Sequence, residues 1–115
     1  MRDADKDVVR LRHMLNACDI LVENKSRDTL EELESNPVKF YGYVKLVEII
    51  GEATYNLTKE FRSAHPETPW KMIEGMRHVL VHDYYRISAS KLWDTVLSDI
   101  PQLQEQLRHI LSSLE

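Results

Sequence analysis

Apolar residues recur every three or four positions along most of the chain, and this helical spacing constrains the fold more than any other feature of the sequence. The clearest stretch predicts a first helix over roughly residues 5 to 24, with an apolar side formed by Val8, Leu11, Leu15, Cys18 and Val22. No segment alternates polar and apolar residues between turn signals, as a half-buried strand would. The spacing therefore predicts an all-α protein.

Two helical segments are predicted in the middle of the chain. Residues 28–34 form a short connecting helix that Asp28 can cap, before Asn36 and proline interrupt it. A long helix then runs from about Val38 to Arg62, with an apolar stripe of Tyr43, Val47, Ile50, Thr54, Leu57 and Phe61. Within it, Gly51 and Ala53 permit another helix to approach closely.

Two more helices are predicted in the C-terminal half. Thr68 is placed as the cap of a third helix that begins at Pro69, because proline needs no backbone N–H at that position. A fourth helix begins near Ser88 or Ser90 and continues to Leu114, with Pro101 kinking or dividing it. Together these segments predict an antiparallel four-helix bundle with a short extra helix, built as one domain over residues 1–115.

Composition and charge exclude several kinds of protein. A net charge of -4 argues against a broad basic surface that coats nucleic acid and leaves room only for a small basic site. Cys18 is the single cysteine, so an intrachain disulfide and a cysteine-based zinc site within one chain are excluded, and we expect Cys18 to be buried. The first seven residues lack the apolar run of a secretory signal, so we expect a cytoplasmic protein without a membrane segment.

One charged residue breaks the apolar pattern of the third helix. Arg77 falls on the same stripe as Trp70, Ile73, Leu80 and Tyr84, at steps of three and four residues. A guanidinium stays protonated at physiological pH and is costly to bury. This stripe must therefore face a carboxylate, a subunit interface or a phosphate-binding cleft, and a structural ion pair is the simplest of these interpretations.

Two histidines and a tyrosine close to Arg77 extend the candidate site. His82 lies five residues later, about 140° around an ideal helix, so the two side chains converge only if the helix distorts or if two chains meet symmetrically. Taken alone, His82 could be a partner of the helix dipole and Tyr84 a core aromatic residue. His78 and His82 have the spacing of a shared zinc site, but no third ligand is indicated, so no metal is expected.

The segment from Gly75 to Tyr84 resembles the R-x4-H-x-Y motif of HepT-type HEPN toxins. Other segments are similar to the same family in the same order, namely Arg10–Met14, Glu48–Ala53, Pro69–Trp70 and Leu92–Val96, so the likeness covers nearly the whole chain. The chain departs from the family at His78, where asparagine is frequent, and at Asp83, where many relatives have glycine.

The resemblance implies a homodimeric HEPN bundle and a metal-independent endoribonuclease toxin without a cofactor. In that family's pattern Arg77 and His82 are the catalytic residues, and we give His78 a supporting role. The implied partners are an RNA substrate and an MntA-type nucleotidyltransferase antitoxin, which transfers AMP to Tyr84. Two alternatives stay open: a non-catalytic helical module that binds a nucleotidyltransferase, and a structural dimerisation domain, which leaves the motif unexplained.

Overall fold

The computed structural model describes residues 3–82 and 88–114, and it describes the side chains of residues 5–77 and 88–114. All regular structure in these residues is helical, which confirms the predicted all-α class. The elements are α1 (Asp3–Lys25), α2 (Leu30–Ser35), α3 (Pro37–Tyr55), α4 (Lys59–Ala64), α5 (Trp70–His82), α6 (Ala89–Asp94), the π-helical segment η2 (Thr95–Asp99) and α7 (Ile100–Leu114).

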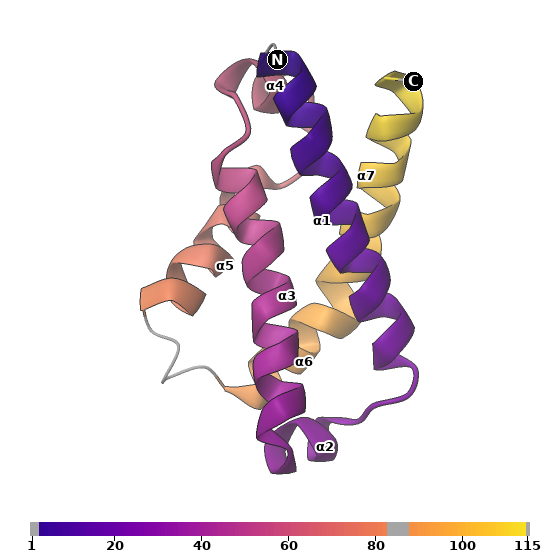
Figure 1. Cartoon of the computed structure of the whole chain (residues 1–115), viewed down its shortest axis with the longest axis vertical. Helices are drawn as coiled ribbons and strands as arrows, with labels where there is room; N and C mark the ends of the chain where they lie inside the picture. The colour runs from indigo at the N-terminus through magenta and orange to yellow at the C-terminus, as the bar shows by residue number, and fades with distance from the viewer. Residues whose placement is uncertain (1–2, 83–87, 115) are drawn as a thin grey trace.

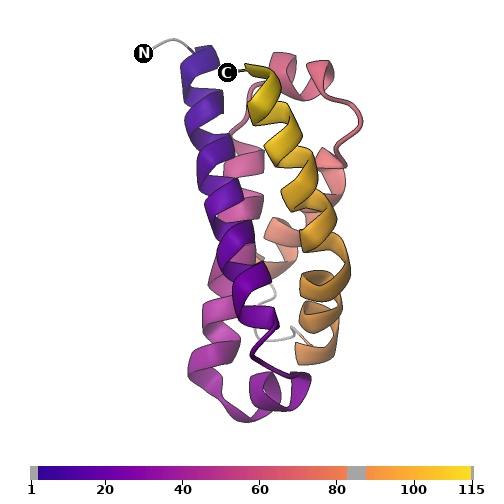
Figure 2. The same cartoon turned by 90° about the vertical axis from the view of Figure 1, so that its right-hand side faces the viewer.

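The long helices alternate in direction along a molecule of 43 × 28 × 24 Å. Figure 1 shows α1 beside α3 and α7, with α5 packed against α3, and Figure 2 shows α1 and α7 running side by side to the end where both termini lie. The short α2 closes the opposite end. Within the described part of the chain, no helix is both long and apolar enough to cross a membrane.

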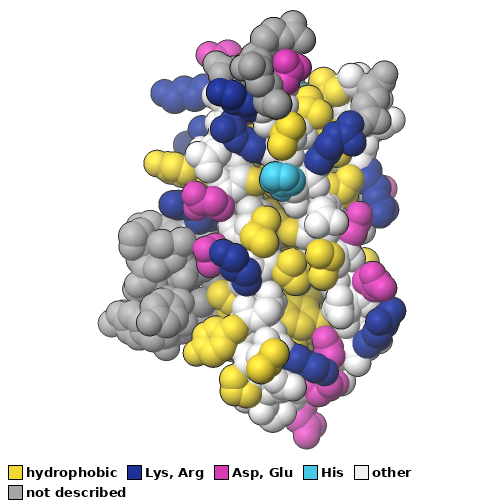
Figure 3. Space-filling view, viewed as in Figure 1, with side chains coloured by type: hydrophobic (Ala, Val, Ile, Leu, Met, Phe, Trp, Pro, Cys, Tyr) yellow, Lys and Arg dark blue, Asp and Glu magenta, His cyan; other side chains and the backbone are white. Residues whose placement is uncertain are grey.

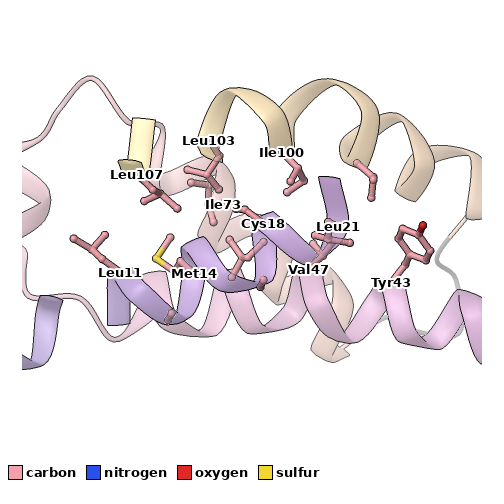
Figure 4. Close-up of a cluster of buried hydrophobic side chains, with 14 of the residues drawn as sticks. Leu11, Met14, Cys18, Leu21, Tyr43, Val47, Ile73, Ile100, Leu103 and Leu107 are labelled. Carbon is pink, nitrogen blue, oxygen red and sulfur yellow. The ribbon is translucent and has the colours of Figure 1, made fainter. Parts of the chain in front are cut away.

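The core lies where α1, α3, α5 and α7 meet. Figure 4 shows its central layer, which is formed by Leu11, Met14, Cys18 and Leu21 from α1, Tyr43 and Val47 from α3, Ile73 from α5, and Ile100, Leu103 and Leu107 from α7. Cys18 is fully buried, as predicted, and burial raises the pKa of its thiol to about 12. At neutral pH this thiol is therefore an uncharged core group.

The cap of α2 differs from the prediction. Thr29, and not Asp28, is the N-cap, because its hydroxyl accepts a hydrogen bond from the Glu32 N–H at 3.2 Å. Asp28 instead accepts hydrogen bonds from Lys39 Nζ at 2.7 Å and from the Tyr43 hydroxyl at 2.6 Å. These two partners, Lys39 first, lower the pKa of Asp28, so this carboxylate fastens the α2 connection to α3.

The single long helix predicted over 38–62 is wrong, because the chain breaks between α3 and α4. Asn56 caps the end of α3, and the Thr58 hydroxyl caps α4 by accepting a hydrogen bond from the Phe61 N–H at 3.1 Å. The buried Asp7 of α1 stabilises the break, since it accepts hydrogen bonds from both the N–H and the hydroxyl of Thr58, at 3.0 and 2.6 Å. A partner 51 residues away in the sequence therefore fixes the residue that begins α4.

The start of α5 lies close to the predicted position but is held differently. The hydroxyl of the buried Thr68 has no hydrogen-bond partner among the described residues, so the predicted side-chain cap is wrong. The backbone makes the turn instead, because the Trp70 N–H donates to the Thr68 carbonyl at 2.9 Å. The Trp70 indole N–H also donates to the His65 carbonyl at 2.9 Å, which fixes the loop between α4 and α5.

The C-terminal helix is divided close to the predicted proline. Ser88 caps α6, and the helix widens into η2 just before Pro101. In this widened turn the Ile100 N–H donates to the carbonyl of Thr95, five residues back. Proline has no N–H and its ring crowds the preceding turn, so a local change of helix geometry accommodates Pro101 without ending the helix.

Candidate functional site

The close approach of α5 to α3 determines where Arg77 lies. Gly51 of α3 is buried directly against the Arg77 backbone, and a Cβ atom added at Gly51 would stand 3.0 Å from the Arg77 Cα and still closer to its Cβ. The prediction that Gly51 permits close helix packing is therefore confirmed. Because the two backbones are so close, Arg77 has to leave the interface sideways, along the surface of α3.

Residues of the last turns of α3 hold the Arg77 guanidinium. Its Nε donates to Glu52 Oε2 at 2.5 Å, and its Cζ lies 4.4 Å from the centre of the Tyr55 ring. The hydrogen bond to Glu52 is the largest of the effects that raise the pKa of Arg77. The predicted carboxylate partner of Arg77 is therefore present, and the guanidinium is permanently charged.

The Arg77 side chain is neither buried nor freely solvated. It is 23% exposed, whereas Glu52 is 49% exposed and Tyr55 51% exposed. Within the described part of the chain, the guanidinium donates one hydrogen bond, from Nε to Glu52. The Nη edge carries four further N–H donors in a planar fork, which matches the spacing of two phosphate oxygens.

The other members of the predicted motif lie outside the described residues. The side chains of His78 and His82, and the whole of Tyr84, belong to that part of the chain. The backbone of α5 is α-helical through His82, so residues 77 and 82 stand about 140° apart around the helix axis. In the described segments, no group of three or more His, Cys, Asp or Glu side chains is placed to hold a metal ion.

A groove of about 250 Å³ lies between α1 and α3, beside the Arg77 site. Its polar lining includes Arg10 and His13 from α1 and Lys45, Glu48 and Glu52 from α3. Glu52 therefore belongs to both the groove and the Arg77 site. Arg10–Met14 and Glu48–Ala53, two of the segments noted in the sequence, meet along this groove.

The sequence did not identify Glu52 and Tyr55 as the residues around Arg77. The available signal was Gly51, because the residue after a close-packed glycine stands at the edge of the helix contact. The distribution of surface charge does not indicate the site either. Figure 3 shows basic and acidic side chains interspersed over the described part of one face, in keeping with the acidic net charge.

The fold and the site together are an all-helical bundle with an arginine held at the α3–α5 contact. Residues 14–110 match the family described as "Ribonuclease HepT-like", and the chain belongs to this family. It is 42% identical over 101 residues to "Putative RNase TTE0752" of Caldanaerobacter subterraneus subsp. tengcongensis, covering 88% of this chain and 90% of that protein.

A second relative matches over nearly its whole length. It is "Probable ribonuclease HepT" of Thermococcus cleftensis, 32% identical over 111 residues, covering 94% of this chain and 99% of that protein. A third, "Gamma-glutamylcyclotransferase and putative RNase MJ0434" of Methanocaldococcus jannaschii, is 32% identical over 111 residues, which cover 96% of this chain and 50% of that protein. No solved structure matches this chain significantly.

Proposed function

We propose that this protein is a metal-independent endoribonuclease and the toxin of a toxin–antitoxin pair. The observation that carries the proposal is the placement of Arg77, a permanently charged guanidinium whose Nε is bound to Glu52 and whose Nη edge has no hydrogen-bond partner among the described residues. Membership of the HepT-like family and relatives named as ribonucleases support the same activity.

The chemistry needs no metal because RNA contains its own nucleophile. The 2'-oxygen attacks the neighbouring phosphorus while His82, acting as a base, accepts the hydroxyl proton. The bond from phosphorus to the 5'-oxygen breaks, and that oxygen takes up a proton from the His82 imidazolium or from water, so that it leaves as a 5'-hydroxyl. Arg77 stabilises the negative charge that develops on the phosphoryl oxygens. The other product then carries a 2',3'-cyclic phosphate, and His78 supports the binding of the phosphate.

A homodimer is the simplest assembly in which this site is complete. Positions 77 and 82 lie on different sides of one straight helix, because five residues correspond to about 140°. A two-fold axis close to α5 brings the motif of one subunit opposite the same motif of the other. We therefore place the cleavage site between two subunits, with RNA bound in a small cleft in keeping with the net charge of -4.

The direct test is cleavage of total cellular RNA by the purified, unmodified protein in EDTA. We expect fragments with 2',3'-cyclic phosphate and 5'-hydroxyl ends, formed at the same rate when Mg²⁺ replaces EDTA. Cleavage that requires added metal would contradict the mechanism. A folded, unmodified protein that leaves RNA intact but binds a nucleotidyltransferase tightly would favour the alternative of a non-catalytic partner module.

The proposed regulator is an MntA-type nucleotidyltransferase antitoxin that transfers AMP from ATP to Tyr84. An adenylyl group on the phenolic oxygen adds bulk and negative charge next to a site that binds phosphate, so it blocks RNA and repels it. Co-expression with this enzyme should add the mass of AMP to the intact protein and abolish cleavage. The added mass should disappear in Tyr84→Phe, and its persistence there would place the modification on another residue.

A further inference from the structure

We propose that Glu52 and Tyr55 are positioning residues that hold the Arg77 guanidinium with its Nη edge directed at the scissile phosphate. This inference rests on the proposed ribonuclease activity and names two residues that act through Arg77 without touching the RNA. Both come from the last two turns of α3, so the helix contact at Gly51 fixes them relative to the Arg77 backbone.

The two contacts restrain different parts of one planar group. The Glu52 carboxylate accepts the hydrogen bond from Nε at 2.5 Å, and Cζ lies over the Tyr55 ring, 4.4 Å from its centre. One contact restrains the Nε side of the guanidinium, and the other restrains its position over the ring. The Nη edge has no hydrogen-bond partner among the described residues, and this edge is the one that forms paired hydrogen bonds to oxyanions.

The exposure of these residues argues for positioning more than for stability. Glu52 and Tyr55 are each about half exposed, and ion pairs at such sites contribute little to folding because water and salt screen them. A long arginine side chain without restraints samples many rotamers, and that freedom has to be lost when it binds the transition state. Because Arg77 is already restrained in the folded protein, its side-chain entropy is lost during folding and not when the transition state binds.

The negative charge of Glu52 gives the proposal a distinctive kinetic signature. A carboxylate next to Arg77 weakens the general attraction of the site for RNA while it orients the guanidinium. Glu52→Ala should therefore lower kcat about 10- to 100-fold, as expected for a misplaced catalytic group, and should leave KM unchanged or lower. Glu52→Gln keeps an oxygen that can accept from Nε, so its kcat should lie between those of Glu52→Ala and the wild type.

Tyr55 is expected to act through its ring and not through its hydroxyl. Tyr55→Phe keeps the aromatic face under Arg77 and should cleave RNA at nearly the wild-type rate. Tyr55→Leu removes that face and should lower kcat severalfold. Two substitutions away from the site serve as matched controls: Glu23→Ala, which removes a carboxylate that pairs with Arg27 at 3.0 Å, and Tyr41→Leu, at a tyrosine that is 58% exposed. Both controls should retain wild-type kcat and KM.

The experiment combines steady-state RNA cleavage with NMR of the arginine side chains. In the wild type, the Nε–H resonance of Arg77, assigned by its loss in Arg77→Ala, should exchange slowly with water. It should become unprotected in Glu52→Ala but not in Glu23→Ala. If Glu52→Ala cleaves RNA with wild-type kcat while Arg77→Ala is inactive, the positioning role is wrong and the proposed function stands. If Arg77→Ala is itself fully active, Arg77 is not a catalytic residue and the positioning role is wrong with it, whatever the NMR spectra show. The proposed function fails only if the folded, unmodified wild type leaves RNA intact.

Discussion

Arg77→Ala and His82→Ala are each expected to reduce RNA cleavage by about 10²–10³-fold, the usual effect of removing one preorganised group that stabilises or moves charge in a transition state. Neither substitution should prevent folding. The Arg77 guanidinium lies outside the core at the surface of α3, and its ion pair is open to solvent. Circular dichroism and thermal unfolding should therefore resemble those of the wild type.

The double variant distinguishes a shared mechanism from two separate defects. If Arg77 and His82 act on one phosphate in one step, the double variant should cleave RNA only slightly more slowly than either single variant, because such effects are strongly non-additive. Arg62→Ala is the matched control. Arg62 lies in the short helix α4, and like Arg77 it is a partly exposed arginine paired with a carboxylate, that of Glu74 at 3.1 Å. Wild-type cleavage by either motif variant, or a large loss in Arg62→Ala, would overturn the assignment.

Helical periodicity predicted the elements that are held by local interactions and missed those held by distant ones. The first helix, the short connector and the division near Pro101 all follow from nearby residues, and each is present. The start of α4 after the break is held by Asp7, which lies 51 residues before Thr58. Leu57, which follows α3, is also buried in the core, so the apolar spacing continues through the break. The spacing alone therefore predicts one helix.

The cap of α2 shows the same limit for a polar residue. Asp28 and Thr29 both suit an N-cap by their chemistry, and the sequence does not distinguish them. The choice is made by α3, where Lys39 and Tyr43 bind the Asp28 carboxylate and leave the cap to Thr29. A competing tertiary partner therefore decides which side chain serves the local structure.

The candidate site was predictable to the extent that it violates a pattern. A charged residue on an apolar stripe required a partner, and Arg77 has one in Glu52. Nothing in the spacing along one helix indicates which residue of a different helix that partner is, so Glu52 and Tyr55 required the three-dimensional arrangement. Gly51 was the useful link, because it marked the point where α3 and α5 come closest.

Gly51→Ala is expected to destabilise the protein by about 1–3 kcal/mol, the usual cost of forcing an extra group into a tightly packed contact. The added methyl group meets the Arg77 Cα at 3.0 Å and its Cβ more closely. The Cα is part of the helix backbone and the Cβ is fixed to it, so neither atom can move without the helix. The two helices have to separate, which also displaces Arg77 from Glu52. Chemical denaturation should show a lower free energy of unfolding, and cleavage by the folded fraction should fall.

The two remaining glycines provide controls on the same helices. A Cβ atom at Gly42 of α3 or at Gly75 of α5 meets nothing within 4 Å, so alanine adds helix propensity at both positions without a clash. Each control should be unchanged or more stable by up to about 1 kcal/mol. If Gly51→Ala were stabilised like them, α5 would have to lie further from α3. The close contact would then no longer explain how Arg77 is directed to Glu52.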